Sequence, residues 1–145
     1  MKNWKITSLI CLVLGSLTIN SVAFAHGTEK HGNTATADVQ MKKLHEMMPM
    51  FSMASAKLEA ALEKGDAAEA EVEAGKIIAA VPDLKKSKPH KNAKLRKMFV
   101  EQAISLGTAT TTTVTLAKSG DFAGAKAAYK KIEKACATCH AKFRD

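Results

Sequence analysis

Several residue types are scarce in this chain. It contains three cysteines, three prolines, one tryptophan and one tyrosine among 145 residues, and aromatic residues make up 5% of it. Alternating runs of β-branched residues, which are typical of strands, are absent. Alanine, lysine, glutamate, leucine and methionine, which favour helices, dominate instead. These features exclude a sheet-based fold and indicate an all-α protein.

The N-terminus has the pattern of a secretory signal. Lys2 and Lys5 precede an apolar run over residues 6–17, and Ala23-Phe24-Ala25 places small residues where a signal peptidase reads them. The apolar run is too short to span a bilayer stably. We therefore expect residues 1–25 to be a signal peptide cleaved after Ala25, a periplasmic location, and no stable insertion into the membrane.

The expected mature chain begins at residue 26 and is long enough for one domain. Loss of Lys2 and Lys5 leaves 20 basic and 14 acidic residues, a net charge of +6. A positive surface suits an acidic partner, and it serves solubility equally well. The lysines are not clustered with aromatic residues, so we expect no nucleic-acid partner.

Helical periodicity begins after a polar lead-in, residues 26–36, and predicts a domain over residues 37–145. Apolar residues recur at intervals of three and four over four segments, which we interpret as helices over 38–64, 66–81, 93–119 and 121–143. Pro49 is expected to kink the first helix or to mark its start, and Pro82 to stop the second. The loop that follows, residues 82–92, should leave His90 in solvent. Short connections between these segments predict an antiparallel four-helix bundle.

The chain closes on the sequence CATCHAKFRD, which contains the two cysteines that remain after processing. Cys136, Cys139 and His140 are spaced i, i+3 and i+4, so in a helix they share one face, which we expect to point into the bundle. Two thioethers and an imidazole on one face suit a flat macrocycle, and C-x-x-C-H is the attachment motif of c-type haem. A zinc site normally needs four ligands, and a redox dithiol normally begins a helix in a βαβ setting, so both are weaker interpretations.

The stretch from Cys136 to Arg144 resembles the C-terminal C-x-x-C-H-x-x-[Phe/Tyr]-Arg of class II cytochromes c, a family that includes cytochrome c-prime and its low-spin relatives. These are secreted four-helix bundles with haem attached near the C-terminus. The resemblance implies one covalent haem c on Cys136 and Cys139, His140 as the proximal iron ligand, and Arg144 near the haem edge. Without the resemblance, Arg144 is a cation at a helix C-terminus. The chain has Lys42 and Lys43 where the family often has an arginine that can meet a propionate.

The distal iron ligand is less directly indicated. In low-spin relatives a methionine of the first helix fills this position, whereas in cytochrome c-prime the residue is apolar. The predicted first helix contains five methionines: Met41, Met47, Met48, Met50 and Met53. Met48 lies on the predicted buried stripe and is our first candidate, with Met41 and His45 as runners-up. Methionine is also a flexible filler of cores, and this alternative stays open.

Three functions are compatible with these residues. The first is an exported mono-haem electron carrier, which is not an enzyme and meets an acidic redox partner protein. The second is a five-coordinate protein that binds NO or CO. The third is a copper-binding protein that uses His45, Met47, Met48 and Met50, because thioethers suit cuprous ion. Members of the family that the chain resembles often dimerise through their first two helices, so the resemblance implies a homodimer as one form of assembly.

Overall fold

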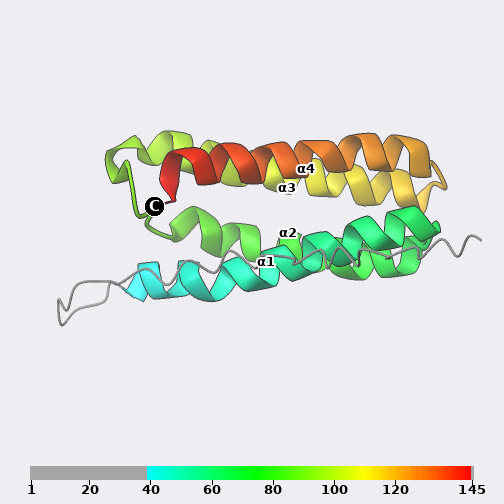
Figure 1. Ribbon diagram of the computed structural model, residues 1–145, viewed down its shortest axis with the longest axis horizontal. Coiled ribbons are helices and arrows are strands. Elements are labelled where there is room, and N and C mark those ends of the chain that lie inside the picture. The colour runs from blue at the N-terminus through cyan, green and yellow to red at the C-terminus, as the bar shows by residue number, and fades with distance from the viewer. Residues whose placement is uncertain (1–38, 145) are drawn as a thin grey trace, which may run out of the picture. The chain divides into compact units, whose positions relative to one another are not determined.

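The computed structural model describes residues 39–144, which form four long helices and one short 3₁₀-helix (Figure 1). Their bounds are α1 Val39–Lys64, α2 Ala67–Lys86, η1 Ala93–Leu95, α3 Arg96–Lys118 and α4 Phe122–Phe143. The described residues contain no strand, and the predicted all-α four-helix bundle is confirmed. The predicted signal peptide and lead-in lie outside the described residues.

Short connections make consecutive helices antiparallel neighbours. α1 packs against α2, α2 against α3 and α3 against α4, while α1 and α4 share the smallest contact among these pairs. Figure 1 shows the cyan start of α1, the connection from α2 to α3 and the red end of α4 at the same end of the bundle. This end, which we call the motif end, carries the C-x-x-C-H sequence. Within residues 39–144, no helix has the length and apolar character needed to cross a bilayer.

The core is built from aliphatic side chains and many alanines. Leu58, Leu62, Ile77 and Ile132 are at most 1% exposed. Burial of each such side chain contributes about 1.5–3 kcal/mol. Ten alanines are also buried: Ala54, Ala61, Ala70, Ala74, Ala103, Ala109, Ala117, Ala125, Ala128 and Ala135. These small side chains let the helices approach closely, and they also mean that much of the core has little apolar area per residue.

Two of the three interhelical turns use the residues that the sequence indicates. Gly65 and Gly120 adopt φ angles of 70° and 83°, a left-handed conformation that glycine adopts without a steric penalty. Asp66 then accepts a hydrogen bond from the Glu69 backbone N–H, and Asp121 accepts one from the Gly124 backbone N–H. These bonds cap α2 and α4. A glycine followed by an aspartate between two helical segments predicts this kind of turn from the sequence alone, and both turns have it.

The predicted end of the second helix is wrong. Pro82 lies inside α2, which continues to Lys86. The missing backbone donor and the clash cost about 3 kcal/mol in an isolated helix, but Leu84, only 5% exposed, anchors the added turn in the core. The Ser87 backbone N–H also donates to the carbonyls of Asp83 and Leu84 and closes the helix. Tertiary packing therefore outweighs the local effect of the proline.

Two smaller expectations also change. Pro49 lies inside α1, which begins ten residues before it, so the alternative of a start near Pro49 is wrong. The predicted third helix is divided into η1 and α3. Leu95, expected on its buried face, is 39% exposed at the end of η1. The sequence period is helical across this segment, but a 3₁₀ turn has three residues per turn and rotates Leu95 off the buried stripe.

Tyr129 ties α4 to α1 near the middle of both helices. Its hydroxyl donates to the Ser55 carbonyl at 3.0 Å and lies 2.9 Å from the Ser55 Oγ, and the residue is 4% exposed. Toward the far end of the bundle, Lys126 pairs with Glu63 at 2.8 Å. The contact between α1 and α4 is therefore fixed on the side away from the motif end.

Replacing Tyr129 with Phe tests this tie, because it removes only the hydroxyl. We expect Tyr129→Phe to lower the free energy of unfolding by about 0.5–1.5 kcal/mol, since the hydrogen bonds of the hydroxyl to Ser55 are lost. Ser55→Ala is the matched control, which removes the Oγ but keeps the carbonyl acceptor, so its loss should be smaller. Urea unfolding followed by circular dichroism measures both. Equal stability of Tyr129→Phe and the wild type would contradict the role of the tie.

The same residue predicts an alkaline loss of stability. Burial raises the pKa of Tyr129 above its ordinary value of 10.0, so the unfolded chain loses this proton at a lower pH than the folded chain does. The contribution of protonated Tyr129 to the free energy of unfolding is complete below about pH 10 and declines as the pH rises beyond it. We expect the stability advantage of wild type over Tyr129→Phe to be constant from about pH 8 to about pH 9 and to shrink as the pH rises above about 10. An advantage that stays constant above about pH 10 would contradict the assignment.

Candidate functional site

The last two turns of α4 present the motif on the core side of the helix. Ile132 is fully buried and Phe143 is 3% exposed, and together they fix which face of α4 turns inward. Cys136 lies four residues after Ile132 and Cys139 seven residues after it, so both fall on this stripe. Both are half-buried, pack against the core and form no disulfide. The expectation that the two sulfur atoms share an inward-facing side agrees with this placement.

The two thiols lie in surroundings that favour their protonated form. Burial raises the pKa of Cys136, and it raises the pKa of Cys139 to about 11, with the neighbouring Cys136 adding to the effect. A redox dithiol works in the opposite direction, because its reactive cysteine has a pKa lowered by nearby positive charge or a helix N-terminus. The two cysteines lie at a helix C-terminus, so their surroundings do not fit a thioredoxin-like site.

His140 follows at the edge of the same face. The residue as a whole is exposed, yet partial desolvation of its ring lowers the pKa of the imidazole, and the positive charge of Arg144 lowers it further. The neutral ring at neutral pH keeps a nitrogen lone pair that can bind a metal. His140 is therefore more exposed than the prediction of an inward-facing ligand suggests, but its protonation state suits that role.

The tie between Tyr129 and Ser55 sets the register of α1 against this motif. In antiparallel helices, a step toward the C-terminus of α4 corresponds to an equal step toward the N-terminus of α1. Cys136 lies seven residues beyond Tyr129, and Met48 lies seven residues before Ser55. The two residues are therefore at about the same level of the bundle. By the same count His140, eleven residues beyond Tyr129, is level with Leu44.

The methionines of α1 are divided between the core and solvent. Met47, Met48 and Met50 are half-buried and pack against the core. Met41 is also half-buried, two helical turns closer to the N-terminus than Met48, while Met53 is 60% exposed. Burial alone therefore does not separate Met48 from Met41, and the register against Cys136 favours Met48.

His45, a residue of the copper-binding hypothesis, contacts a second histidine. It is exposed, and its ring centroid lies 4.8 Å from that of His90, in the connection between α2 and α3. His90, expected in solvent, is half-buried through this contact. Within residues 39–144, no group of three or more His, Cys, Asp or Glu side chains is placed to hold a metal ion. This arrangement also gives no support to the zinc alternative.

The connection from α2 to α3 is hydrogen-bonded to the end of α4, a contact that sequence reasoning missed. The Lys91 backbone N–H donates to the Phe143 carbonyl at 3.2 Å, and the Asn92 side-chain amide donates to the Lys142 carbonyl at 2.7 Å. Asn92 has a φ of 54°, a conformation that asparagine tolerates better than most residues. Arg144 lies beside these bonds as the exposed C-cap of α4. The one local signal for this turn is an asparagine before a helix. The neighbouring sequence contains no signal for its hydrogen-bond partner, Lys142, 50 residues away.

The donor set fits a covalently bound haem. Two half-buried thiols and a neutral imidazole occupy adjacent positions at one end of the core, and methionine side chains of α1 lie at the same level. Cysteine sulfur supplies the attachment, and histidine with methionine is an axial pair found in c-type cytochromes.

Comparison with known proteins agrees with this chemistry. A family model described as cytochrome c-prime matches residues 90–144, from the loop before η1 to the end of the motif. The match covers less than half of the chain and is consistent with a class II cytochrome c that binds haem. No curated protein and no solved structure matches the chain.

Proposed function

We propose that this protein is an exported, periplasmic mono-haem cytochrome that carries electrons. In this proposal one haem c is attached to Cys136 and Cys139, His140 is the proximal iron ligand and Met48 is the distal ligand. The observation that carries the proposal is the placement of Cys136 and Cys139 on the core side of α4, with Cys136 level with Met48 of α1. No substrate is transformed, so the protein is not an enzyme.

Each of these residues has a distinct task. The bound haem supplies a centre that gains and loses one electron. Cys136 and Cys139 hold it by covalent bonds, so it is not lost to the surroundings. His140 is neutral at neutral pH and offers its lone pair without first losing a proton. Apolar neighbours such as Leu44 and Phe51, which are 7% and 8% exposed, keep water away from this end of the core.

A second candidate function is binding of NO or CO at a five-coordinate iron. Leu44 favours it, because this residue is buried and lies level with His140. An apolar residue in the distal position leaves the iron open to small gases, whereas methionine closes it. The two functions therefore differ in whether Met48 or Leu44 faces the iron.

Covalent attachment predicts a defined mass. Produced in a host that matures c-type cytochromes, the denatured polypeptide should carry the added mass of one haem, because thioether bonds survive unfolding. The double variant Cys136→Ser/Cys139→Ser should lose this mass entirely. Ala137→Ser, an exposed change between the two cysteines, is the matched control and should keep it. Mass spectrometry under denaturing conditions measures the masses of the wild type and both variants. A wild-type chain without the added mass would refute the proposal.

Ligation by Met48 predicts a change of spin state. We expect the Met48→Leu variant to lose the weak red absorption band of a methionine–iron bond and to bind CO when reduced, because leucine has no donor atom. Met53→Leu, at an exposed position of the same helix, should leave the spectrum unchanged. Visible spectra of the oxidised and reduced proteins, with and without CO, measure this. A wild-type protein that is already high-spin and binds CO would instead support gas binding.

A further inference from the structure

The positive charge of the described residues is concentrated in one segment. Seven basic residues and no acidic residue lie between positions 85 and 97: Lys85, Lys86, Lys88, Lys91, Lys94, Arg96 and Lys97. The rest of the described chain, residues 39–84 and 98–144, contains 12 basic and 11 acidic residues. The net charge therefore comes almost entirely from the end of α2, η1, the start of α3 and the loop between them.

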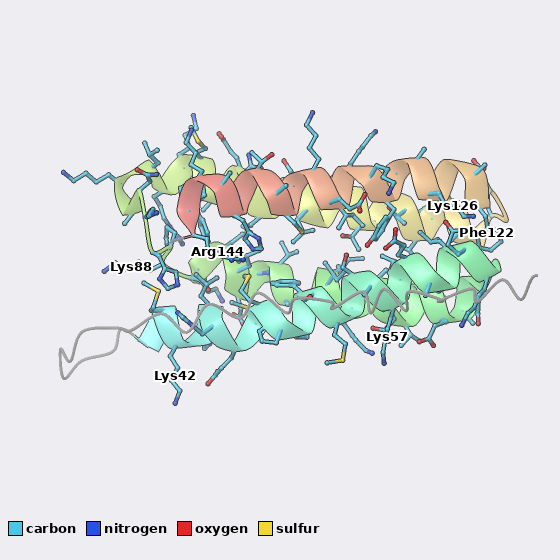
Figure 2. All side chains as sticks on the ribbon, viewed as in Figure 1. Lys42, Lys57, Lys88, Phe122, Lys126 and Arg144 are labelled. Carbon is cyan, nitrogen blue, oxygen red and sulfur yellow. The ribbon has the colours of Figure 1, made fainter. Side chains whose placement is uncertain are left out.

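This segment is held at the motif end. The Lys91 backbone N–H binds the carbonyl of Phe143, three residues beyond His140, and the Asn92 side chain binds that of Lys142, two residues beyond it. In Figure 2, Lys88 and Arg144 lie at one end of the bundle, while Phe122 and Lys126 lie at the other. The basic segment is thus next to the residues proposed to hold the haem.

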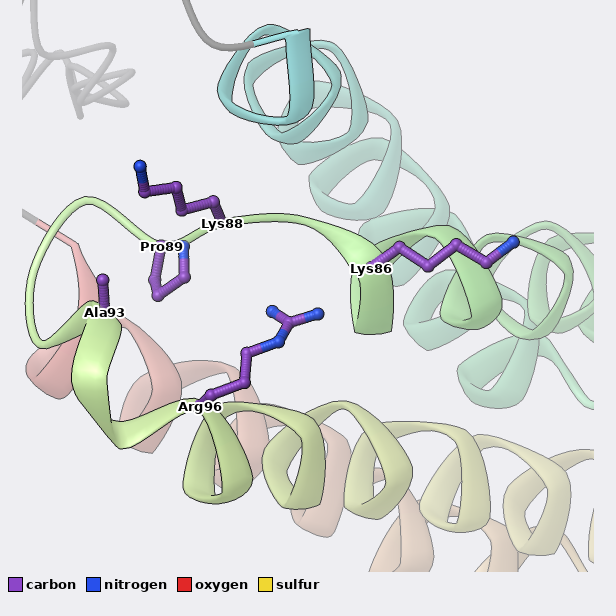
Figure 3. A pocket seen from close by; sticks show the side chains of 5 residues that line it. All are labelled: Lys86, Lys88, Pro89, Ala93 and Arg96. Carbon is purple, nitrogen blue, oxygen red and sulfur yellow. The ribbon is translucent and has the colours of Figure 1, made fainter.

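A fixed hollow opens within the segment. It has a volume of about 420 Å³ and is lined by Lys86, Lys88, Pro89, Ala93 and Arg96. Figure 3 shows the Arg96 side chain rising from α3 toward the loop, while the Lys86 and Lys88 side chains extend away from it. Arg96 donates to the carbonyls of Lys85 and Ser87, which fixes its position. No acidic residue lines the hollow, and Arg96 is the charged side chain that points into it.

We infer that this surface, the basic end surface formed by Lys86, Lys88, Lys94, Arg96 and Lys97, is the docking site for an acidic electron-transfer protein. The inference rests on the proposed function. A partner that presents carboxylates here would bring its own redox centre to the end of the bundle where the haem is proposed to lie. A lipid surface fits less well, because Leu95, at 39% exposed, is the only large exposed apolar residue within positions 85–97.

Electrostatic steering would act on the rate of encounter. Complementary charges raise association rates, by about tenfold or more in favourable cases, and this gain falls as salt screens the charges. The local density of charge matters more than the total when the Debye length is short, as it is at physiological ionic strength. The basic end surface should therefore affect the rate more than the same number of charges elsewhere.

The test uses the haem-loaded protein and an acidic flavodoxin as reductant, so that one electron leaves the reduced flavin and converts ferric to ferrous haem. Lys94→Glu/Lys97→Glu changes two exposed residues of the surface. Lys64→Glu/Lys131→Glu changes two exposed lysines outside it by the same charge. Stopped-flow spectroscopy measures the second-order rate constant at several salt concentrations. We expect about a fivefold loss for the first variant at low salt, less than twofold for the second, and convergence of all three proteins at high salt.

The outcomes separate this inference from the proposed function. Full reduction by dithionite is recorded first for each protein, and a wild type without reducible haem would overturn the proposed function and this inference with it. Equal losses of the rate constant in both variants would show that only net charge matters. No loss in either variant would show that the surface is not used. Either result overturns the docking site. Unchanged rates together with lost binding to phosphatidylglycerol vesicles would assign the surface to lipid instead.

Discussion

The antiparallel register of α1 against α4 is the constraint on which the candidate site depends. It is set by one buried tyrosine hydroxyl, which binds the Oγ and the carbonyl of Ser55 near the middle of both helices. A shift of one helical turn along α1 would carry Met48 about 5 Å away from the level of Cys136. A polar tie suits this purpose, because it is directional, whereas packing of alanine on alanine would tolerate more than one register.

The contact between α1 and α4 has different side chains at its two ends. Away from the motif, small side chains such as Ala61 and Ala125 allow close packing, and Lys126 pairs with Glu63 across the two helices. At the motif end, the half-buried residues are Met47, Met48, Met50 and the two cysteines. Methionine is unbranched and adapts to irregular space. An end lined by adaptable side chains can accommodate a large flat group, and the closely packed end keeps the helices aligned while it does so.

The sequence was sufficient for features that depend on neighbouring residues. Periodicity predicted four helices, Gly65-Asp66 and Gly120-Asp121 predicted two turns, and the spacing of the cysteines placed them on the inward face of α4. It was insufficient where distant residues decide. From the sequence alone, Pro82 is expected to end its helix, and the burial of Leu84 explains why it does not. His90 is likewise expected in solvent, but it contacts His45. The choice between Met48 and Leu44 at the proposed distal position belongs to this second group, because it depends on how two helices far apart in sequence align.

The continuation of α2 through Pro82 also shapes the charged end of the protein. If the helix ended at Val81, Lys85 and Lys86 would belong to a loop, and the carbonyls of Lys85 and Ser87 would not be presented together to Arg96. With the added turn, Arg96 binds both carbonyls at the negative end of the helix dipole, where a cation is favoured. Its guanidinium is thereby held at the end of α2, and the neighbouring Lys86 pairs with Asp83 at 3.8 Å. The bonds of Lys91 and Asn92 to α4 then hold this charge beside the C-x-x-C-H motif. The same few contacts that close the fold therefore hold the basic segment at the motif end, where we propose that the acidic partner docks.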